Sequence, residues 1–255
     1  MTKAINRTGG KNSPLNATER VISLTVLDVF GRQADEITRI SNVANAIGGK
    51  NIMNVDKWNT KLSQLVEPSL FDPVLRGGNA ALNMVNINLP EWIEDPRIAE
   101  SIRNSSLRFA RNVNDETFTQ LRTELINLVT DGQGASVISR RLRSVFEDKI
   151  SRGQAETIAR SEFIRSQSLG QIEAWKQTGV IHKKVWLASG DACPFCLAMN
   201  GKVVGIDENF QNKDDAMTVE FQERIIGMRF GYSEIQSPPL HPNCRCTLTA
   251  EIEQI

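Results

Sequence analysis

The chain has 255 residues, 40% of them hydrophobic, with 30 basic residues balancing 30 acidic ones. This length and composition suffice for one large or two modest domains with a real core. Because the formal charges balance, the chain has no net electrostatic field that would by itself attract nucleic acid or a membrane. Because no apolar run approaches the roughly eighteen residues of a membrane span, we expect a soluble protein.

The first 150 residues are patterned as helices. Residues 1–12 are polar with nothing to bury, so we expect a disordered tail. A capping box at Asn16 and Glu19 begins a helix that is predicted to continue to Gly48. We expect a connector at 86–95. Further helices are predicted at 56–66 (ended by Pro68), at 73–85 (weakened by Gly77 and Gly78), from Pro96, from Asn114 to Asp131, and from Ser136.

A second capping box, at Ser151 and Gln154, predicts a long helix that ends near Thr178, because Gly179 stands in the position that terminates helices. On a helical wheel its apolar residues occupy both faces, so both sides are expected to be buried. We therefore expect this helix to be a central strut between the helical region and the remainder of the chain.

The strut helix carries three charged residues, Arg160, Glu162 and Arg165. An unpaired buried ion costs several kcal/mol, so these charges need partners. Glu162 and Arg165 are three residues apart and can pair across one helical turn. We interpret the three as structural ion pairing, since a catalytic Glu162 would need a second partner that the sequence does not identify.

After Gly179 the pattern becomes extended. Strands are predicted at 184–187, at 203–204 after an Asn-Gly turn, and at 246–252, forming a small antiparallel sheet. The intervening excursion, 207–237, is too long for an ordinary loop, so we expect a helix around 217–228. Partner-specific contacts are expected in this excursion.

All four cysteines lie in two clusters, Cys193 with Cys196 and Cys244 with Cys246, and His241 precedes the second. A Cys-x-x-Cys knuckle joined by a distant second cluster can complete a tetrahedral zinc site. Cys244 and Cys246 would face the same side of a strand. The five side chains compete for four positions, and structural zinc is the favoured interpretation. Disulfides are disfavoured because residues 1–11 have no signal-peptide core and cytosolic chains rarely keep disulfides.

Two enzymatic alternatives are weaker. A deaminase needs an upstream His-x-Glu, whereas His182 is followed by two lysines, and with only His182 and His241 the chain poorly serves a nuclease of paired histidines. Cys-Pro-Phe-Cys is similar to a glutaredoxin site, but such redox pairs follow the first strand of a compact sheet, and here a long helical region comes first. We therefore expect no enzyme.

Several motifs together resemble the phage Mu F-like head morphogenesis family, whose members are also called minor head or minor capsid proteins. The resemblance covers about residues 114–248. The motifs are, in order, Ala159-Arg160-Ser161-Glu162, Val185-Trp186, Asp191-Ala192-Cys193-Pro194-Phe195-Cys196, Asn200-Gly201-Lys202-Val203 and Pro238-Pro239-Leu240-His241-Pro242-Asn243-Cys244-Arg245-Cys246.

The resemblance implies a non-enzymatic role in assembling the heads of tailed bacteriophages or prophages, in the host cytoplasm and then in the procapsid interior and virion. Implied partners are the portal protein and the scaffold or major capsid protein, with phage DNA a further candidate during packaging or ejection; no membrane is implied. The metal positions suspected in the family fall on Cys193, Cys196, His241, Cys244 and Cys246. Some members carry toxin-like extensions, but the chain ends shortly after Cys246, so we expect no such effector.

The expected fold is therefore α+β: a mostly helical amino-terminal region, a long central helix, and a small antiparallel β unit pinned by the Cys and His clusters. The expected organisation is a tail at 1–12, a helical region at 13–111, and a Mu F-like domain at 112–255 with its excursion at 207–237.

Overall fold

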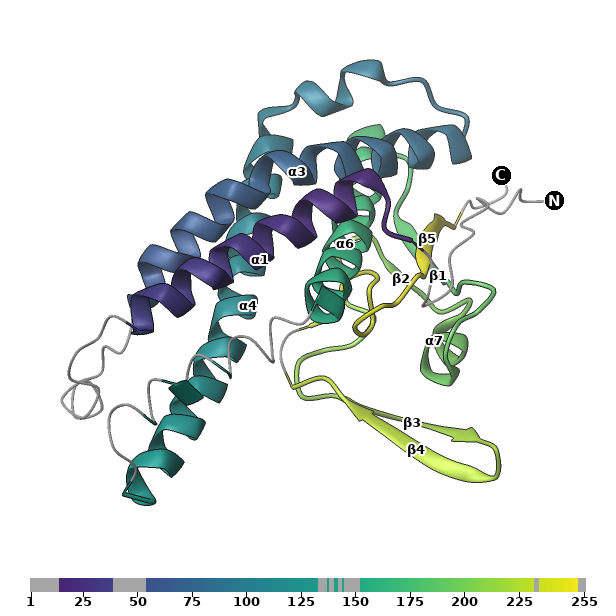
Figure 1. The fold of residues 1–255 in the computed structure, drawn as a ribbon. Coiled ribbons are helices and arrows are strands. Elements are labelled where there is room, and N and C mark those ends of the chain that lie inside the picture. The colour runs from purple at the N-terminus through teal and green to yellow at the C-terminus, as the bar shows by residue number, and fades with distance from the viewer. Residues whose placement is uncertain are drawn as a thin grey trace. The chain divides into compact units, whose positions relative to one another are not determined.

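The computed structural model describes residues 14–38, 54–132, 137, 140–141, 144, 152–231 and 234–251. Helices dominate the first part of the chain and short strands the last part, so the predicted α+β class is confirmed (Figure 1). No helix in these ranges is long and apolar enough to cross a membrane. The elements are α1 (Ala17–Thr38), α3 (Val55–Met84), η1 (Pro90–Glu94), α4 (Pro96–Thr130), α6 (Arg152–Thr178), β1 (Lys183–Leu187), α7 (Pro194–Met199), β2 (Val203–Gly205), β3 (Ala216–Phe221), β4 (Arg224–Arg229) and β5 (Thr247–Ala250).

The chain forms two compact units that are interleaved along the sequence, and α3, α4 and α6 each contribute residues to both. The helical unit comprises Glu19–Ser69 and Ile102–Ala159, and the mixed unit comprises Met1–Thr18, Leu70–Ser101 and Arg160–Ile255.

Polar side chains interrupt the apolar core of the helical unit. The Asn114 amide of α4 donates to Asn59 Oδ1 at 2.7 Å and accepts from Gln33 Nε2 at 2.9 Å. The hydroxyls of Ser63 and Ser106 lie 2.8 Å apart. All of these side chains are buried, so their mutual hydrogen bonds offset the cost of removing them from water.

The mixed unit is built around a three-stranded antiparallel sheet with strand order β2-β1-β5. Val185 of β1 is paired with Val203 of β2 and with Thr249 of β5. Trp186 is fully buried and meets the ring of Phe210 edge-on, with their centroids 5.2 Å apart. The predicted small sheet is thus confirmed, and β1 at its centre positions the segments that follow.

Helices α3 and α6 approach backbone to backbone within the mixed unit. A Cβ at Gly170 would lie 2.0 Å from the Val74 carbonyl oxygen, and one at Gly77 would lie 2.0 Å from the Gln167 oxygen. Only glycine fits such a crossing, because atoms this close would overlap. The predicted end of α6 is also confirmed, with Gly179 in the left-handed region at φ 68°.

The predicted helix boundaries at Pro68 and Asn114 are wrong. Helix α3 runs unbroken past Pro68, and Leu70 and Val74 beyond it are fully buried, so burial outweighs the hydrogen bond that proline removes. Asn114 lies inside the continuous α4, where its amide is satisfied in the core instead of capping a new helix. The weakening expected at Gly77 is likewise absent from α3.

The start of α1 and the connector at 86–95 can be compared with the structure, whereas several other predictions fall outside the described residues. Helix α1 begins where the capping box predicts it; its predicted extension beyond Thr38 lies outside the described residues, as do the tail at 1–12 and most of the helix from Ser136. The connector at 86–95 contains the short η1, in which Trp92 is buried.

The helix predicted around 217–228 is also wrong, because β3 and β4 form an antiparallel hairpin there. β-branched and aromatic residues such as Val219, Phe221 and Ile226 favour strands. The turn residues Gln222 and Glu223 have φ angles of 50° and 61°, which matches the two-residue turn that joins twisted strands.

Candidate metal centre

The first cysteine cluster lies at the start of α7, just after the central strand β1. Cys193 is extended (φ −69°, ψ 165°) and precedes Pro194, the first helical residue, while its carbonyl accepts the Leu197 N–H at 2.9 Å. A proline at this position favours helix initiation. The resulting turn buries Cys196 and leaves Cys193 half-buried.

The second cluster sits on a tight turn that leads into β5. The Cys244 N–H donates to the His241 carbonyl at 3.1 Å, and Asn243 adopts a left-handed φ of 61°. The Asn243 N–H also donates to Ser161 Oγ of α6 at 3.2 Å. Because Thr247 at the start of β5 pairs with Leu187 at the end of β1, the sheet brings the two clusters together.

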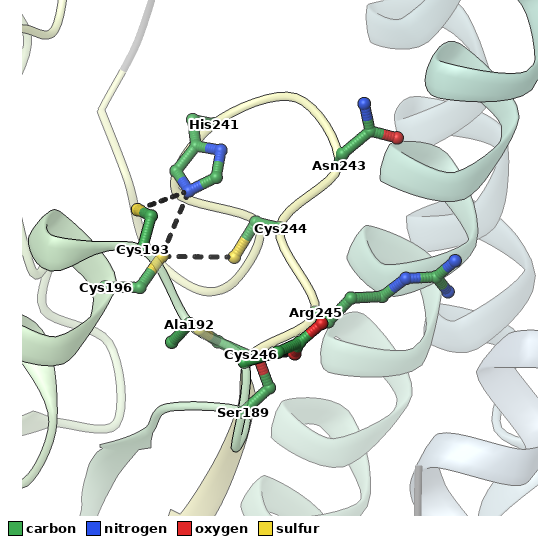
Figure 2. Close-up of a pocket in the computed structure, with 10 residues that line it drawn as sticks. Ser189, Ala192, Cys193, Cys196, His241, Asn243, Cys244, Arg245 and Cys246 are labelled. Atoms are coloured by element: carbon green, nitrogen blue, oxygen red, sulfur yellow. Dashed lines mark hydrogen bonds between the residues drawn. The ribbon is translucent and has the colours of Figure 1, made fainter. Parts of the chain in front are cut away.

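The structure places all five sequence-predicted metal residues at one site (Figure 2). The His241 Nε2 atom lies 3.1 Å from Cys193 Sγ and 3.2 Å from Cys196 Sγ. Cys196 Sγ lies 3.6 Å from Cys244 Sγ. Two overlapping groups have their ligand atoms within 4.8 Å of one another, and Cys196 belongs to both. The groups are Cys193, Cys196 and His241, and Cys196, Cys244 and Cys246.

These separations fit a single tetrahedral ion better than a disulfide. With Zn–S bonds of about 2.3 Å, two thiolates on one zinc lie about 3.8 Å apart, close to the 3.6 Å between Cys196 and Cys244. A disulfide would need about 2.05 Å, and all four cysteines are free. The same residues line a cavity of about 20 Å³, the size of one water or ion.

The buried thiols of the second group perturb one another's pKa values. Hydrogen bonds with Cys244 and Cys246, together with burial, raise the pKa of Cys196. Hydrogen bonds with Cys196 and Cys244 lower the pKa of Cys246. A bound cation would favour thiolates at the remaining positions, as is usual for zinc.

The charged residues predicted on the strut helix lie on α6, which also carries Ser161, the hydrogen-bond partner of Asn243 in the turn before β5. Glu162 is fully buried and forms an ion pair with Arg165, which is partly exposed. Arg160 is buried as well. The ion pair offsets part of the cost of burying this charge, because it involves carboxylate oxygen Oε2, while Oε1 is buried without a hydrogen-bond partner in the described part of the chain.

Some residues at the site were not predicted to have a role there. Ser189 and Asp191 line the cavity, and the Ser189 hydroxyl donates to Asp191 Oδ1 at 3.0 Å. Ser161 and Asn243 fix the second cluster against α6. Ser161, Asp191 and Asn243 lie in the motifs that carry the family resemblance, whereas Ser189 lies outside them. The Arg245 side chain points away from the sulfur atoms (Figure 2). His182, the other histidine, is exposed and lies outside both groups.

Comparison with known proteins assigns the chain to a protein family. The family described as "Phage Mu protein F like protein" matches residues 119–249, which is just over half of the chain and includes all five clustered residues. The chain belongs to this family.

A curated relative has also been found. The chain is 22% identical over 176 residues to "Uncharacterized protein YqbB" of Bacillus subtilis (strain 168), covering 68% of this chain and 57% of that protein. The Phage Mu F-like chain therefore spans little more than half of this relative. No solved structure matches.

Proposed function

We propose that the protein is a minor head protein that acts, without enzymatic activity, in assembling the procapsid of a tailed bacteriophage or prophage. The observation that carries this proposal is the match to the Phage Mu F-like family across the clustered Cys and His residues. The proposed location is the procapsid interior and virion, reached from the host cytoplasm. The portal protein and the scaffold or major capsid protein are the proposed partners, and phage DNA is a further candidate.

The proposed domain is 112–255, held by a structural zinc ion. Cys193, Cys196 and His241 supply three ligands, and Cys244 and Cys246 compete for the fourth, since Cys196 belongs to both groups. The ion would supply positive charge that stabilises buried thiolates and would cross-link α7 to the segment before β5. Four ligands from the chain leave no position for an activated water, which is why the proposal is structural rather than hydrolytic.

The metal proposal is tested by metal analysis of the purified, reduced chain and by thermal melting before and after chelation. We expect about one zinc per chain and a melting temperature that falls on chelation. His241→Ala should reduce metal content, whereas His182→Ala, a change at the exposed histidine, should not. Full metal content in both variants would point to four cysteine ligands, and no metal in the parent chain would contradict the site.

The head-assembly proposal is tested in a phage or prophage whose copy of this coding sequence has been deleted. We expect fewer normal heads by electron microscopy, restored by the parent chain. The chain itself should be found in purified heads by quantitative mass spectrometry. Normal infectious heads without the chain, or its absence from heads, would overturn the proposal.

One observation favours a thiol redox protein as a second candidate. Cys193 lies at the start of α7 and is more exposed than Cys196, as in thiol redox sites at helix starts. Exchange with oxidised glutathione at neutral pH would couple reduction of glutathione to a Cys193–Cys196 disulfide. Failure of the reduced, metal-free chain to exchange would exclude this candidate.

A further inference from the structure

Five clustered side chains compete for the ion, whereas a structural zinc ion takes four ligands. One of the five is therefore not a ligand, and the turn before β5 identifies which one. Cys193 and Cys196 form a Cys-x-x-Cys knuckle at the start of α7, so the choice lies among His241, Cys244 and Cys246. The inference rests on the zinc site proposed above and assigns the four atoms that bind the ion.

The ring of His241 is oriented for metal binding through Nε2. Its Nδ1 atom lies 2.8 Å from the Pro242 carbonyl oxygen. A carbonyl oxygen can only accept a hydrogen bond, so Nδ1 carries the proton, and in the neutral ring the lone pair is on Nε2. Nε2 faces the sulfur atoms of Cys193 and Cys196, at 3.1 and 3.2 Å. A metal-bound histidine usually donates its other N–H to a carbonyl in this way, which favours His241 as a ligand.

Cys244 follows His241 with two residues between them, which is also the spacing of the Cys-Pro-Phe-Cys knuckle. The Cys244 N–H closes a tight turn by donating to the His241 carbonyl at 3.1 Å. Pro242 and the left-handed Asn243 occupy the two central positions, which suits residues of these types. Such a turn keeps its first and last Cα atoms within about 7 Å of each other. His241 and Cys244 therefore form a second knuckle with the spacing of the first.

Contacts between sulfur and nitrogen atoms join the two knuckles without a break (Figure 2). Cys196 Sγ lies 3.6 Å from Cys244 Sγ, close to the roughly 3.8 Å expected for two thiolates on one zinc ion. Three thiolates and a neutral imidazole leave a divalent ion with a single net negative charge, whereas four thiolates leave two. Burying the smaller charge costs less desolvation, which also favours a set that includes the histidine.

Cys246 has partners of its own at the end of the three-stranded sheet. The register pairs Thr247 with Leu187, so Cys246 lies next to the end of β1. The Ser189 backbone and the Trp186 side chain interact with the Cys246 sulfur. Trp186 Nε1 is buried and has no other hydrogen-bond partner in the part of the chain that the structure describes. A buried N–H needs an acceptor, so Cys246 has a role at this sheet end that does not require the ion.

From these contacts we propose that the ion is bound by Cys193 Sγ, Cys196 Sγ, His241 Nε2 and Cys244 Sγ. Cys246 is then a positioning residue, which accepts the Trp186 N–H and holds the turn against β1 without binding the ion. The ion joins the knuckle of α7 to the knuckle of the turn, and Cys246 joins the turn to the sheet. The two roles can be separated by experiment, because only the loss of a ligand removes the metal.

The direct test is NMR of the reduced parent chain loaded with NMR-active cadmium, a thiophilic ion that replaces zinc in thiolate sites. Couplings between the ion and protons of the chain pass through the ligand atoms, so they identify the ligands. We expect couplings to all four proposed ligands and none to Cys246. The measurement needs no variant, so it decides the assignment even where a substitution prevents folding.

Two matched substitutions separate the roles of Cys244 and Cys246, which are both buried and lie in the same segment. Zinc affinity is measured by competition with a chelator. Cys244→Ser should weaken zinc binding by more than about a hundredfold, because a ligand is lost, whereas Cys246→Ser should weaken it by about tenfold at most. Cys246→Ala should still bind about one zinc per chain. It should melt at a lower temperature than Cys246→Ser, with zinc and without, because alanine cannot accept the Trp186 N–H.

Any coupling of cadmium to Cys246, or a loss of zinc affinity in Cys246→Ser as large as that in Cys244→Ser, would overturn the assignment and leave the zinc site standing. Two ions per chain would overturn it as well. A parent chain that binds neither zinc nor cadmium would refute the proposed zinc site together with this inference. None of these results bears on the head-assembly proposal, which deletion of the coding sequence tests separately.

Discussion

Replacing Gly170 by alanine tests the crossing that holds α6 against α3. The new Cβ would lie 2.0 Å from the Val74 oxygen and 3.0 Å from the Gly78 nitrogen, and both are backbone atoms that no rotamer change can move. The helices must therefore separate by about 1 Å, and overpacking of this kind costs up to about 3 kcal/mol. Alanine regains about 1 kcal/mol of helix propensity. We expect a net loss of about 2 kcal/mol in the free energy of unfolding.

Urea unfolding followed by circular dichroism and tryptophan fluorescence measures this loss. Gly31→Ala is the matched control, because Gly31 lies inside α1 with nothing within 4 Å of the new Cβ. That change should stabilise the protein by about 0.5 to 1 kcal/mol. The two substitutions are chemically identical, so opposite signs isolate the contact. A Gly170→Ala variant as stable as Gly31→Ala would refute the close crossing.

Three further changes probe the two units. Cys193→Ser should abolish the fall in melting temperature that chelation causes in the parent chain. It should also make the mixed unit more susceptible to proteolysis, because structural zinc contributes about 10 to 16 kcal/mol to the stability of small sites. Unchanged stability would count against a metal. Asn114→Leu should lower the free energy of unfolding, measured with urea, by about 3 kcal/mol, since the amide groups of Asn59 and Gln33 lose their partner. The control Asn112→Leu, at an exposed position, should change it by no more than about 0.5 kcal/mol. Burial lowers the pKa of Lys184 from 10.5 to about 8, so the unfolded chain binds this proton more tightly than the folded chain does. The free energy of unfolding of the parent should therefore rise between pH 8 and 10.5, by about 3 kcal/mol at most, relative to that of Lys184→Met. Parallel curves of unfolding free energy against pH would contradict this.

The cysteine site could be predicted because its chemistry leaves few alternatives. Four cysteines in two clusters, with a histidine beside the second, restrict the sensible geometries, and the structure brings the two segments together through β1 and β5. Capping boxes placed the starts of α1 and α6 for a similar reason, since a side chain must satisfy the free N–H groups of a helix start. These signals depend on local chemistry, and at these positions the tertiary contacts agree with it.

The wrong predictions arose where tertiary contacts outweigh local propensity. Pro68 normally ends a helix, but burial of Leu70 beyond it holds α3 together. Asn114 has the residue type of a cap, yet its partners Asn59 and Gln33 come from distant segments and no local pattern reveals them. The hairpin was missed although Met217, Val219 and Phe221 alternate with polar residues, because its turn, Gln222-Glu223, lacks the Asn-Gly or Gly signal that marks a hairpin.

The polar residues of α6 explain why a helix buried on most sides is not wholly apolar. Gln171 donates to the Leu248 carbonyl at 3.2 Å and accepts from the Thr247 hydroxyl at 3.2 Å, while Ser161 accepts the Asn243 N–H. These bonds satisfy backbone and side-chain groups on both sides of Cys244 and Cys246. The loop is therefore held by α6 independently of any ion, which lowers the ordering cost of metal binding. The strut helix thus helps to position the candidate metal ligands Cys244 and Cys246.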